Sequence, residues 1–251
     1  MITDPWFYAL AVPAMLIVGI SKGGFGAGLG ILAVPMMAIR LPVPQVAAIM
    51  LPILCLMDLA TLWNYRGRWN LRILAITLPA GVIGTVIGAV SFGVLPEPWI
   101  RLLIGLIAVG FTLYRWLWRP EIGTARGLQP VKGFFWATVS GFTSFLANAG
   151  APPIQVYMLP LGLDKAEFVG TMTVLFAVIN YAKIPSFFAL DLITRTNMLT
   201  ALVLVPCAPI GIWLGVAINK RVDQALFYKA CYAFLLLAGG KLIYDAIVAL
   251  T

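Results

Sequence analysis

Residues 6–39 read WFYALAVPAMLIVGISKGGFGAGLGILAVPMMAI, an apolar stretch interrupted in its middle by a serine, a lysine and several glycines. As one continuous helix this stretch would measure about 51 Å, whereas the hydrocarbon core of a bilayer is roughly 30 Å thick. Each apolar arm alone is about 15 residues long and spans only about 22 Å. We therefore expect a hairpin of two short helices, 6–20 and 25–39, whose glycine-rich tip lies at depth in the membrane.

The rest of the chain has the composition of a helical membrane protein. Of 251 residues, 62% are apolar and 10% are charged, whereas a soluble domain is about 25% charged. Blocks such as 43–63 are continuously apolar and do not alternate, which favours membrane helices over a β-barrel. No Lys or Arg precedes Lys22, so the start lacks the basic region of a signal peptide and we expect the first segment to stay in the mature protein. The fold class predicted is an all-α integral membrane protein.

The charge balance and the missing residue types exclude several classes of function. The formal net charge is +8, but the basic residues stand in short loops beside apolar blocks, which indicates membrane topology and not nucleic-acid binding. Histidine, the commonest general base, is absent. A hydrolase within the membrane would need a serine with a base or two deep aspartates, and only Asp58 is deep. With no nucleotide-binding motif or metal cluster, we expect no cofactor and no enzyme.

An internal repeat divides the chain into two halves. At an offset of 122 positions Gly19 matches Gly141 and Asp58 matches Asn180, and at 127 positions Gly84 matches Gly211. The repeats are predicted at 1–120 and 132–251, joined by a cytoplasmic linker at 121–131. The second hairpin is expected over 133–161, with arms 133–146 and 153–161 around a break at 147–152. The three spans that follow each hairpin are expected at 43–63, 71–92 and 99–118 in the first half and at 166–189, 197–218 and 224–250 in the second.

The distribution of basic residues favours hairpins over single crossings of the broken stretches. If each hairpin returns to its own side, ten Lys and Arg residues are cytoplasmic and two, Arg40 and Arg195, lie outside. If each broken stretch crosses once, the split is eight against four. The positive-inside rule therefore predicts two inverted repeats with both termini outside. The ten residues are Arg66, Arg68, Arg72, Arg115, Arg119, Arg126, Lys132, Lys165, Lys220 and Arg221.

The two hairpin tips carry the residues that we expect to bind a solute. Glycine and proline free backbone N–H groups from helical pairing, a helix N-terminus carries about half a positive charge, and Lys22 adds a full one. An anion is the expected ligand; the alternative is that the small residues only let helices pack closely. The candidates are Ser21, Lys22, Gly23, Gly24, Gly26, Gly28 and Gly30 in the first tip and Thr143, Ser144, Asn148, Gly150, Pro152, Pro153 and Gln155 in the second.

Three polar residues fall inside the expected spans: Asp58, Asn180 and Lys183. Ionisable groups there cost several kcal/mol unless they are paired or wet, which makes them functional candidates. Asp58 could pair with Lys183, or exchange a proton that drives transport; alternatively both could reach the membrane interface. Cys55, one helical turn before Asp58, leaves open a thiol acting on a sulfur-containing solute.

The run from Gly19 to Pro35, GISKGGFGAGLGILAVP, repeated in weaker form from Gly141, resembles the TauE/SafE sulfite exporter family, also called the toluene-sulfonate uptake permease family. The resemblance covers nearly the whole chain. It implies a bacterial inner-membrane secondary carrier for sulfite, sulfonates or related anions. The second tip departs from the pattern, since Asn148-Ala-Gly-Ala-Pro-Pro153 stands where the first has glycines, so an equal role for both tips stays open.

The function predicted is a secondary transporter that binds a small anion near the midplane between the two tips and moves it by alternating access. Its expected partners are the anion, the lipid bilayer and a coupling proton or sodium ion, and no nucleic acid. The alternative is an anion channel that uses the same tips as a selectivity filter.

Overall fold

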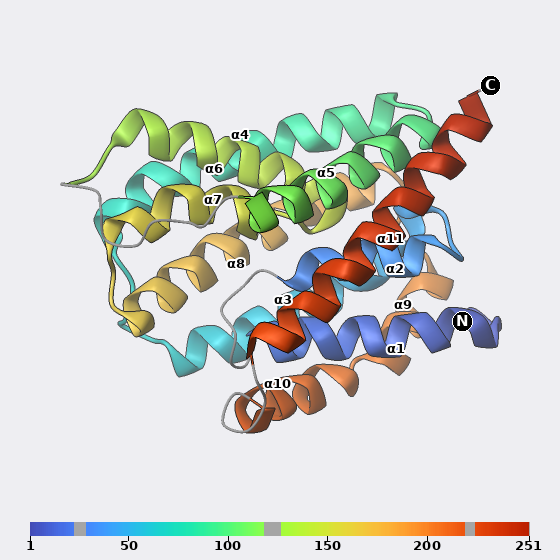
Figure 1. Ribbon diagram of the computed structural model, residues 1–251, viewed down its shortest axis with the longest axis horizontal. Coiled ribbons are helices and arrows are strands. Elements are labelled where there is room, and N and C mark those ends of the chain that lie inside the picture. Colours follow the sequence, from blue (N-terminus) through green and yellow to red (C-terminus); the bar gives the residue numbers. More distant parts are fainter. Residues whose placement is uncertain (23–28, 118–126, 219–223, 251) are drawn as a thin grey trace.

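The computed structural model describes residues 1–22, 29–117, 127–218 and 224–250, and all regular structure in these ranges is helical (Figure 1). Among the described residues, five segments are long and apolar enough to cross a membrane, which supports the predicted helical membrane fold. They are Val43–Asn64, Leu71–Val94, Glu97–Tyr114, Ala166–Ala189 and Arg195–Gly215. Most of the linker expected at 121–131 lies outside the described residues.

The helices follow one another in a similar order in the two halves. The first half contains α1 (Pro5–Ile20), the 3-10 turn η2 (Leu29–Leu32), α2 (Ala33–Ala38), α3 (Val43–Asn64), α4 (Leu71–Val94) and α5 (Glu97–Leu117). The second contains α6 (Pro130–Ala147), α7 (Ala151–Met158), the 3-10 turn η3 (Leu159–Leu161), α8 (Lys165–Ala189), α9 (Arg195–Leu204), α10 (Cys207–Ile218) and α11 (Gln224–Leu250).

The segment expected as a span over 197–218 overlaps the candidate membrane span Arg195–Gly215, but it contains an interruption that the sequence analysis did not predict. It forms two helices, α9 and α10, separated at Val205 and Pro206. Pro206 has no backbone N–H to donate, and its ring clashes with the carbonyl one turn earlier. Pro206 matches Pro79 of α4 in the repeat. Pro206 interrupts its helix, whereas α4 continues through Pro79.

Both broken stretches double back. Asp4, the N-cap of α1, pairs with Arg40, just beyond α2, at 2.9 Å between carboxylate and guanidinium, so the two ends of the first stretch lie together. Near the start of α6, a Cβ built on Gly133 would lie 2.7 Å from the ring of Tyr157 at the end of α7. The described ends of each stretch therefore lie against each other.

The break in the second hairpin has a clear local cause. Asn148 adopts a left-handed conformation, with φ of 51°, and its N–H bonds the Ser144 carbonyl at 3.0 Å. The next N–H, of Ala149, bonds the Thr143 carbonyl at 3.2 Å. This pattern closes a helix C-terminus, and Pro152 and Pro153 then suit the first turn of a new helix.

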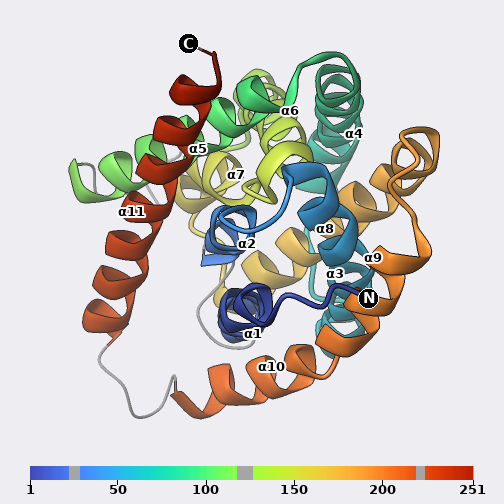
Figure 2. The ribbon, with the colours of Figure 1, turned by 90° about the vertical axis from the view of Figure 1, so that its right-hand side faces the viewer.

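The helices pack most extensively across the two halves. α4 of the first half packs along α6 of the second. In the same way, α10 of the second half packs along α1 of the first. α5 packs along α11, and α3 packs along α8. In Figure 2, α1, α2 and α3 lie inside a ring that includes α4, α5, α9, α10 and α11. One hydrophobic cluster joins α4 with α6, α7 and α8 of the second half. The packed units therefore mix the two halves of the sequence.

Glycines allow the closest of these crossings. A Cβ on Gly84 of α4 would lie 1.9 Å from the Thr138 carbonyl of α6, and one on Gly141 would lie 2.0 Å from the Gly81 carbonyl. On the other side, a Cβ on Gly211 of α10 would lie 2.7 Å from the Leu16 carbonyl of α1. Small residues let helix backbones approach in this way. Close packing therefore explains these glycines, which lie outside the tips.

We expect Gly84→Ala to lower the melting temperature of the detergent-purified protein, because the added methyl group pushes α4 away from α6. Overpacking of this kind costs about 1–3 kcal/mol. Gly110→Ala is the matched control, since no atom lies within 4 Å of a Cβ built there. In that exposed helix position alanine is neutral or stabilising. Equal melting temperatures for the two variants would contradict the close crossing.

Candidate site between the hairpin tips

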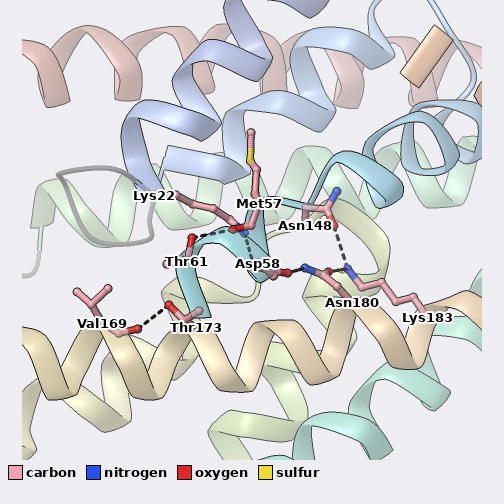
Figure 3. A network of polar contacts seen from close by, with 9 residues as sticks. All are labelled: Lys22, Met57, Asp58, Thr61, Asn148, Val169, Thr173, Asn180 and Lys183. Atoms are coloured by element: carbon pink, nitrogen blue, oxygen red, sulfur yellow. Dashed lines mark hydrogen bonds and ion pairs between the residues drawn. The ribbon is translucent and has the colours of Figure 1, made fainter. Parts of the chain in front are cut away.

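A buried carboxylate joins the two halves at the centre of the molecule. Asp58 of α3 is 1% exposed. Its Oδ1 accepts a hydrogen bond from the Lys22 ammonium in an ion pair, and its Oδ2 accepts one from the Asn180 amide of α8 at 2.6 Å (Figure 3). Asp58 and Asn180 are the residues matched at 122 positions in the repeat. Matched residues that touch each other lie where the two halves meet.

Lys183 is the second cation of the site and is also 1% exposed. Its ammonium donates to the Ser144 carbonyl at 2.7 Å, to Asn148 Oδ1 at 2.9 Å and to Asn180 Oδ1 at 3.1 Å. An ammonium has three N–H groups, and here each has an oxygen partner. The Ser144 carbonyl belongs to the C-terminal end of α6, whose partial negative charge favours a cation.

Asn180 connects the two charges. Its amide nitrogen donates to Asp58 while its amide oxygen accepts from Lys183 (Figure 3). Asp58 and Lys183 are therefore linked through Asn180 and not by the direct pair considered from the sequence. The alternative in which Asp58 and Lys183 reach the membrane interface is wrong, because both side chains are buried between the packed helices.

A cavity lies beside this network. It offers about 60 Å³ to the centre of a water-sized sphere, well above the roughly 10–15 Å³ that one water needs. Three pairs of residues in its wall are separated by the same 122 positions, so both halves contribute to it. The pairs are Lys22 with Ser144, Gly30 with Pro152, and Leu54 with Phe176.

The site carries an excess of positive charge. The three oxygen partners of Lys183 need three N–H groups, so Lys183 is counted as an ammonium. With Lys22 it brings two positive charges against the one negative charge of Asp58, which gives this cluster of three a net charge of one positive unit. Lys22 and Asn180 line the cavity itself. A small anion placed there would balance the cluster, whereas a cation would add to the excess.

Several predicted tip residues line the cavity and others do not. Ser21, Lys22, Gly30, Ser144, Asn148 and Pro152 line it. Thr143, Gly150, Pro153 and Gln155 are not part of its wall. The Thr143 hydroxyl can donate to the Val139 carbonyl of its own helix, at 2.9 Å, or to the Ala149 carbonyl in the break, at 3.1 Å. Gly23, Gly24, Gly26 and Gly28 lie outside the described residues.

The second tip offers fewer free backbone N–H groups than the sequence led us to expect. Pro152 and Pro153 follow Ala151 at the start of α7, and proline has no N–H. The polar groups at this tip are instead side chains, those of Ser144 and Asn148. Cys55, proposed for thiol chemistry, is buried on α3 and does not line the cavity.

Sequence reasoning missed the apolar part of the wall, which includes Met50, Leu54 and Phe176. The repeat contained the signal, because the 122-position offset that matches Asp58 with Asn180 also matches Leu54 with Phe176. It also missed Ser140, whose hydroxyl donates to the Gly150 carbonyl at 2.7 Å and fixes the start of α7.

Three phenylalanines close the site beyond Lys183. Phe187 follows Lys183 by one turn of α8 and is 2% exposed. Its ring centroid lies 5.5 Å from that of Phe145, which lies 5.6 Å from that of Phe92. Edge-to-face aromatic contacts of this kind pack densely. The network of charges is therefore covered on this side by an apolar layer.

This arrangement defines the class of protein: a helical membrane protein with a cavity lined by residues of both halves beside a buried network of charges. The family model described as sulfite exporter TauE/SafE matches residues 11–242, and the chain belongs to this family of membrane transporters. The searches of curated proteins and of solved structures gave no match. The family supports a membrane sulfite or anion exporter over an enzyme.

We expect Ser140→Ala to weaken the second tip, because the buried Gly150 carbonyl loses its hydroxyl donor. The carbonyl then keeps only the long bond from the Ile154 N–H at 3.5 Å. A lost hydrogen bond costs about 0.5–1.5 kcal/mol, which should lower the melting temperature of the purified protein. Ser91→Ala is the control for loss of a serine hydroxyl, since the Ser91 hydroxyl bonds the Ile87 carbonyl of its own helix at 2.9 Å, on an exposed face. An equal loss in both variants would refute a special role of Ser140.

Proposed function

We propose that the chain is a secondary transporter that binds one small oxyanion, such as sulfite or a sulfonate, in the cavity between the two hairpin tips. The observation that carries this proposal is the cavity itself, whose wall is built from matched residues of both halves and includes Lys22 of a net positive cluster. Its size suits a small anion and not a nucleotide. Family membership supports the same class of solute.

The side chains around the cavity have different roles in this proposal. Lys22 attracts the anion, which competes with Asp58 for the ammonium. Lys183 holds Asn148 and Asn180 by their amide oxygens, which leaves the Asn148 amide nitrogen, in weak contact with Met50 Sδ at 3.7 Å, available to the anion. Ser21 and Ser144 complete the polar wall.

The proposal includes two inverted repeats and alternating access. The hairpins that double back and the packing of matched helices against each other both support an inverted arrangement. The face that carries Arg66, Arg68 and Arg72 is then cytoplasmic. The moving bodies are α4 with α6–α8 on one side and α1–α3 with α9 and α10 on the other, so the cavity lies between them.

A carrier accounts for the structure better than the alternative, an anion channel. A conducting channel needs a path that is open to both sides at once. Here Phe92, Phe145 and Phe187 cover the network on one side, and the Lys22–Asp58 ion pair stands beside the cavity. A carrier exposes its site to one side of the membrane at a time, so it needs no path that is open to both sides at once.

In proteoliposomes we expect saturable uptake of labelled sulfite or methanesulfonate with counterflow. Lys22→Ala combined with Asp58→Asn removes the lysine without leaving a buried carboxylate unpaired. Because a hydrogen bond to a charged group contributes about 1.5–3 kcal/mol, the KM of the double variant should rise at least about tenfold relative to Asp58→Asn alone.

Lys132→Ala, which removes an exposed lysine at the start of α6, is the control for loss of charge. If the double variant transports as well as Asp58→Asn, Lys22 only neutralises the aspartate and does not bind the anion. Flux that neither saturates nor shows counterflow would favour the channel.

Asp58 is the candidate for proton coupling, because it is an ionisable group at depth that contacts the proposed anion ligand Lys22. We expect Asp58→Asn to retain exchange of labelled for unlabelled anion but to lose accumulation driven by an imposed pH gradient. The measurement is the steady-state ratio of internal to external anion with and without the gradient. Accumulation by Asp58→Asn at the wild-type level would show that Asp58 is not the coupling residue. Repeating the measurement with a sodium gradient in place of the proton gradient tests sodium as the coupling ion.

A further inference from the structure

Two more cavities continue from the site toward one face of the molecule. The first offers about 40 Å³ to the centre of a water-sized sphere and is lined by Lys22, Asp58, Thr61, Thr173 and Phe176, among others. The second offers about 490 Å³, and we call it the vestibule. Its wall includes Lys22, Thr61, Asn64, Tyr65 and Arg68. Lys22 lines all three cavities, so they form a series with Lys22 at each junction.

One face of α8 lines both the narrow cavity and the deep cavity. Thr173 and Phe176 line the narrow cavity, and Phe176 and Asn180 line the deep one. Residues three or four apart share a helix face, so the same face continues to Lys183 and then to Phe187 in the closed aromatic layer. The described cavities therefore lead from the vestibule to the site on the side opposite to that layer.

The vestibule has a fixed rim. The Arg68 N–H bonds the Tyr65 carbonyl at 3.0 Å, and a Cβ on Gly170 of α8 would lie 1.8 Å from the Arg68 carbonyl, so the loop lies directly on α8. Two residues later, the backbone N–H of Asn70 donates to the Thr171 hydroxyl at 2.9 Å. The side-chain amide of Asn70 donates to the Glu167 carboxylate at 2.8 Å. The backbone of Arg68 is thereby held at the mouth of the vestibule.

The two arginines of this loop are in different environments. The Arg66 guanidinium lies over the Trp63 ring, 4.7 Å from its centroid, and Arg66 is not in the vestibule wall. Arg68 is in that wall, and none of the ion pairs between described residues includes it. At the inner end Asp58 is already paired with Lys22. The vestibule therefore has a cation at its mouth and another at its inner end.

We infer that the vestibule is a second anion-binding site, at which Arg68 receives the oxyanion before it passes Lys22 to the deep cavity. This inference rests on the proposed function and deepens it. A planar guanidinium presents parallel N–H donors that match two oxygens of one oxyanion, whereas the compact ammonium of Lys22 acts as a point charge. Binding at Arg68 raises the local anion concentration at the junction that Lys22 occupies.

The test compares Arg68→Gln with Arg66→Gln in the proteoliposome assay, with the anion added on the side from which an impermeant thiol reagent labels Arg68→Cys. The KM of Arg68→Gln should rise about tenfold while the maximal rate is largely retained. Arg66→Gln should keep the wild-type KM. Arg68→Cys is made in a variant in which Cys55, Cys207 and Cys231 are replaced by alanine and which retains transport.

A positively charged thiol reagent on Arg68→Cys should restore the low KM, and a negatively charged one should raise the KM further. A merely structural role of Arg68 would not give opposite effects. Equal KM values for the two glutamine variants, or the same effect of both reagents, would overturn the inference while leaving the deep site standing. Absence of saturable uptake by the wild-type protein would instead overturn the proposed function, and the vestibule site with it.

Discussion

The Asp58 carboxylate is the group on which the centre of this protein depends. An ionised carboxylate at membrane depth costs several kcal/mol unless its oxygens are paired. Here one oxygen binds Lys22, which follows α1, and the other binds Asn180 of α8. These two contacts fix the first hairpin against α3 and α3 against α8. The position of the cavity and the closeness of its two walls follow from them.

The network also shows why the two halves cannot be identical in sequence. Two carboxylates facing each other across 2.6 Å would repel, and two amides would leave Lys22 without a counter-charge. The pair Asp58 and Asn180 satisfies both needs. The lysines are distributed unevenly as well: Lys22 of the first tip matches Ser144, whereas Lys183 of the second span matches Thr61. A symmetric framework thus holds an asymmetric set of charges.

The sequence allowed the helical fold and the break after Ala147 to be predicted, because Asn148, Gly150 and Pro152 favour the end of one helix and the start of another. Residues 23 and 24 of the break expected at 21–24 lie outside the described residues, so that break stays a prediction. The sequence also identified the residue types around the cavity, although their role in binding stays a prediction. It did not allow the bridge through Asn180, the split of α9 from α10 or the wall of Leu54 and Phe176 to be predicted. The bridge depends on contacts between distant segments, which local periodicity does not encode, and the wall could be read only from the repeat. The split is local, but α4 continues through Pro79 while α9 ends before Pro206, so a proline alone does not predict a break.

The crossings of α1 with α10 and of α4 with α6 have a consequence for biosynthesis. Gly19 on α1 and Gly84 on α4 face backbone of the opposite half, so after synthesis of the first half these faces still lack their partners. α10 leaves the ribosome after the whole first half and after α6–α9. The first hairpin therefore reaches its final packing only after α10 has entered the bilayer, and the first half does not complete its packing by itself.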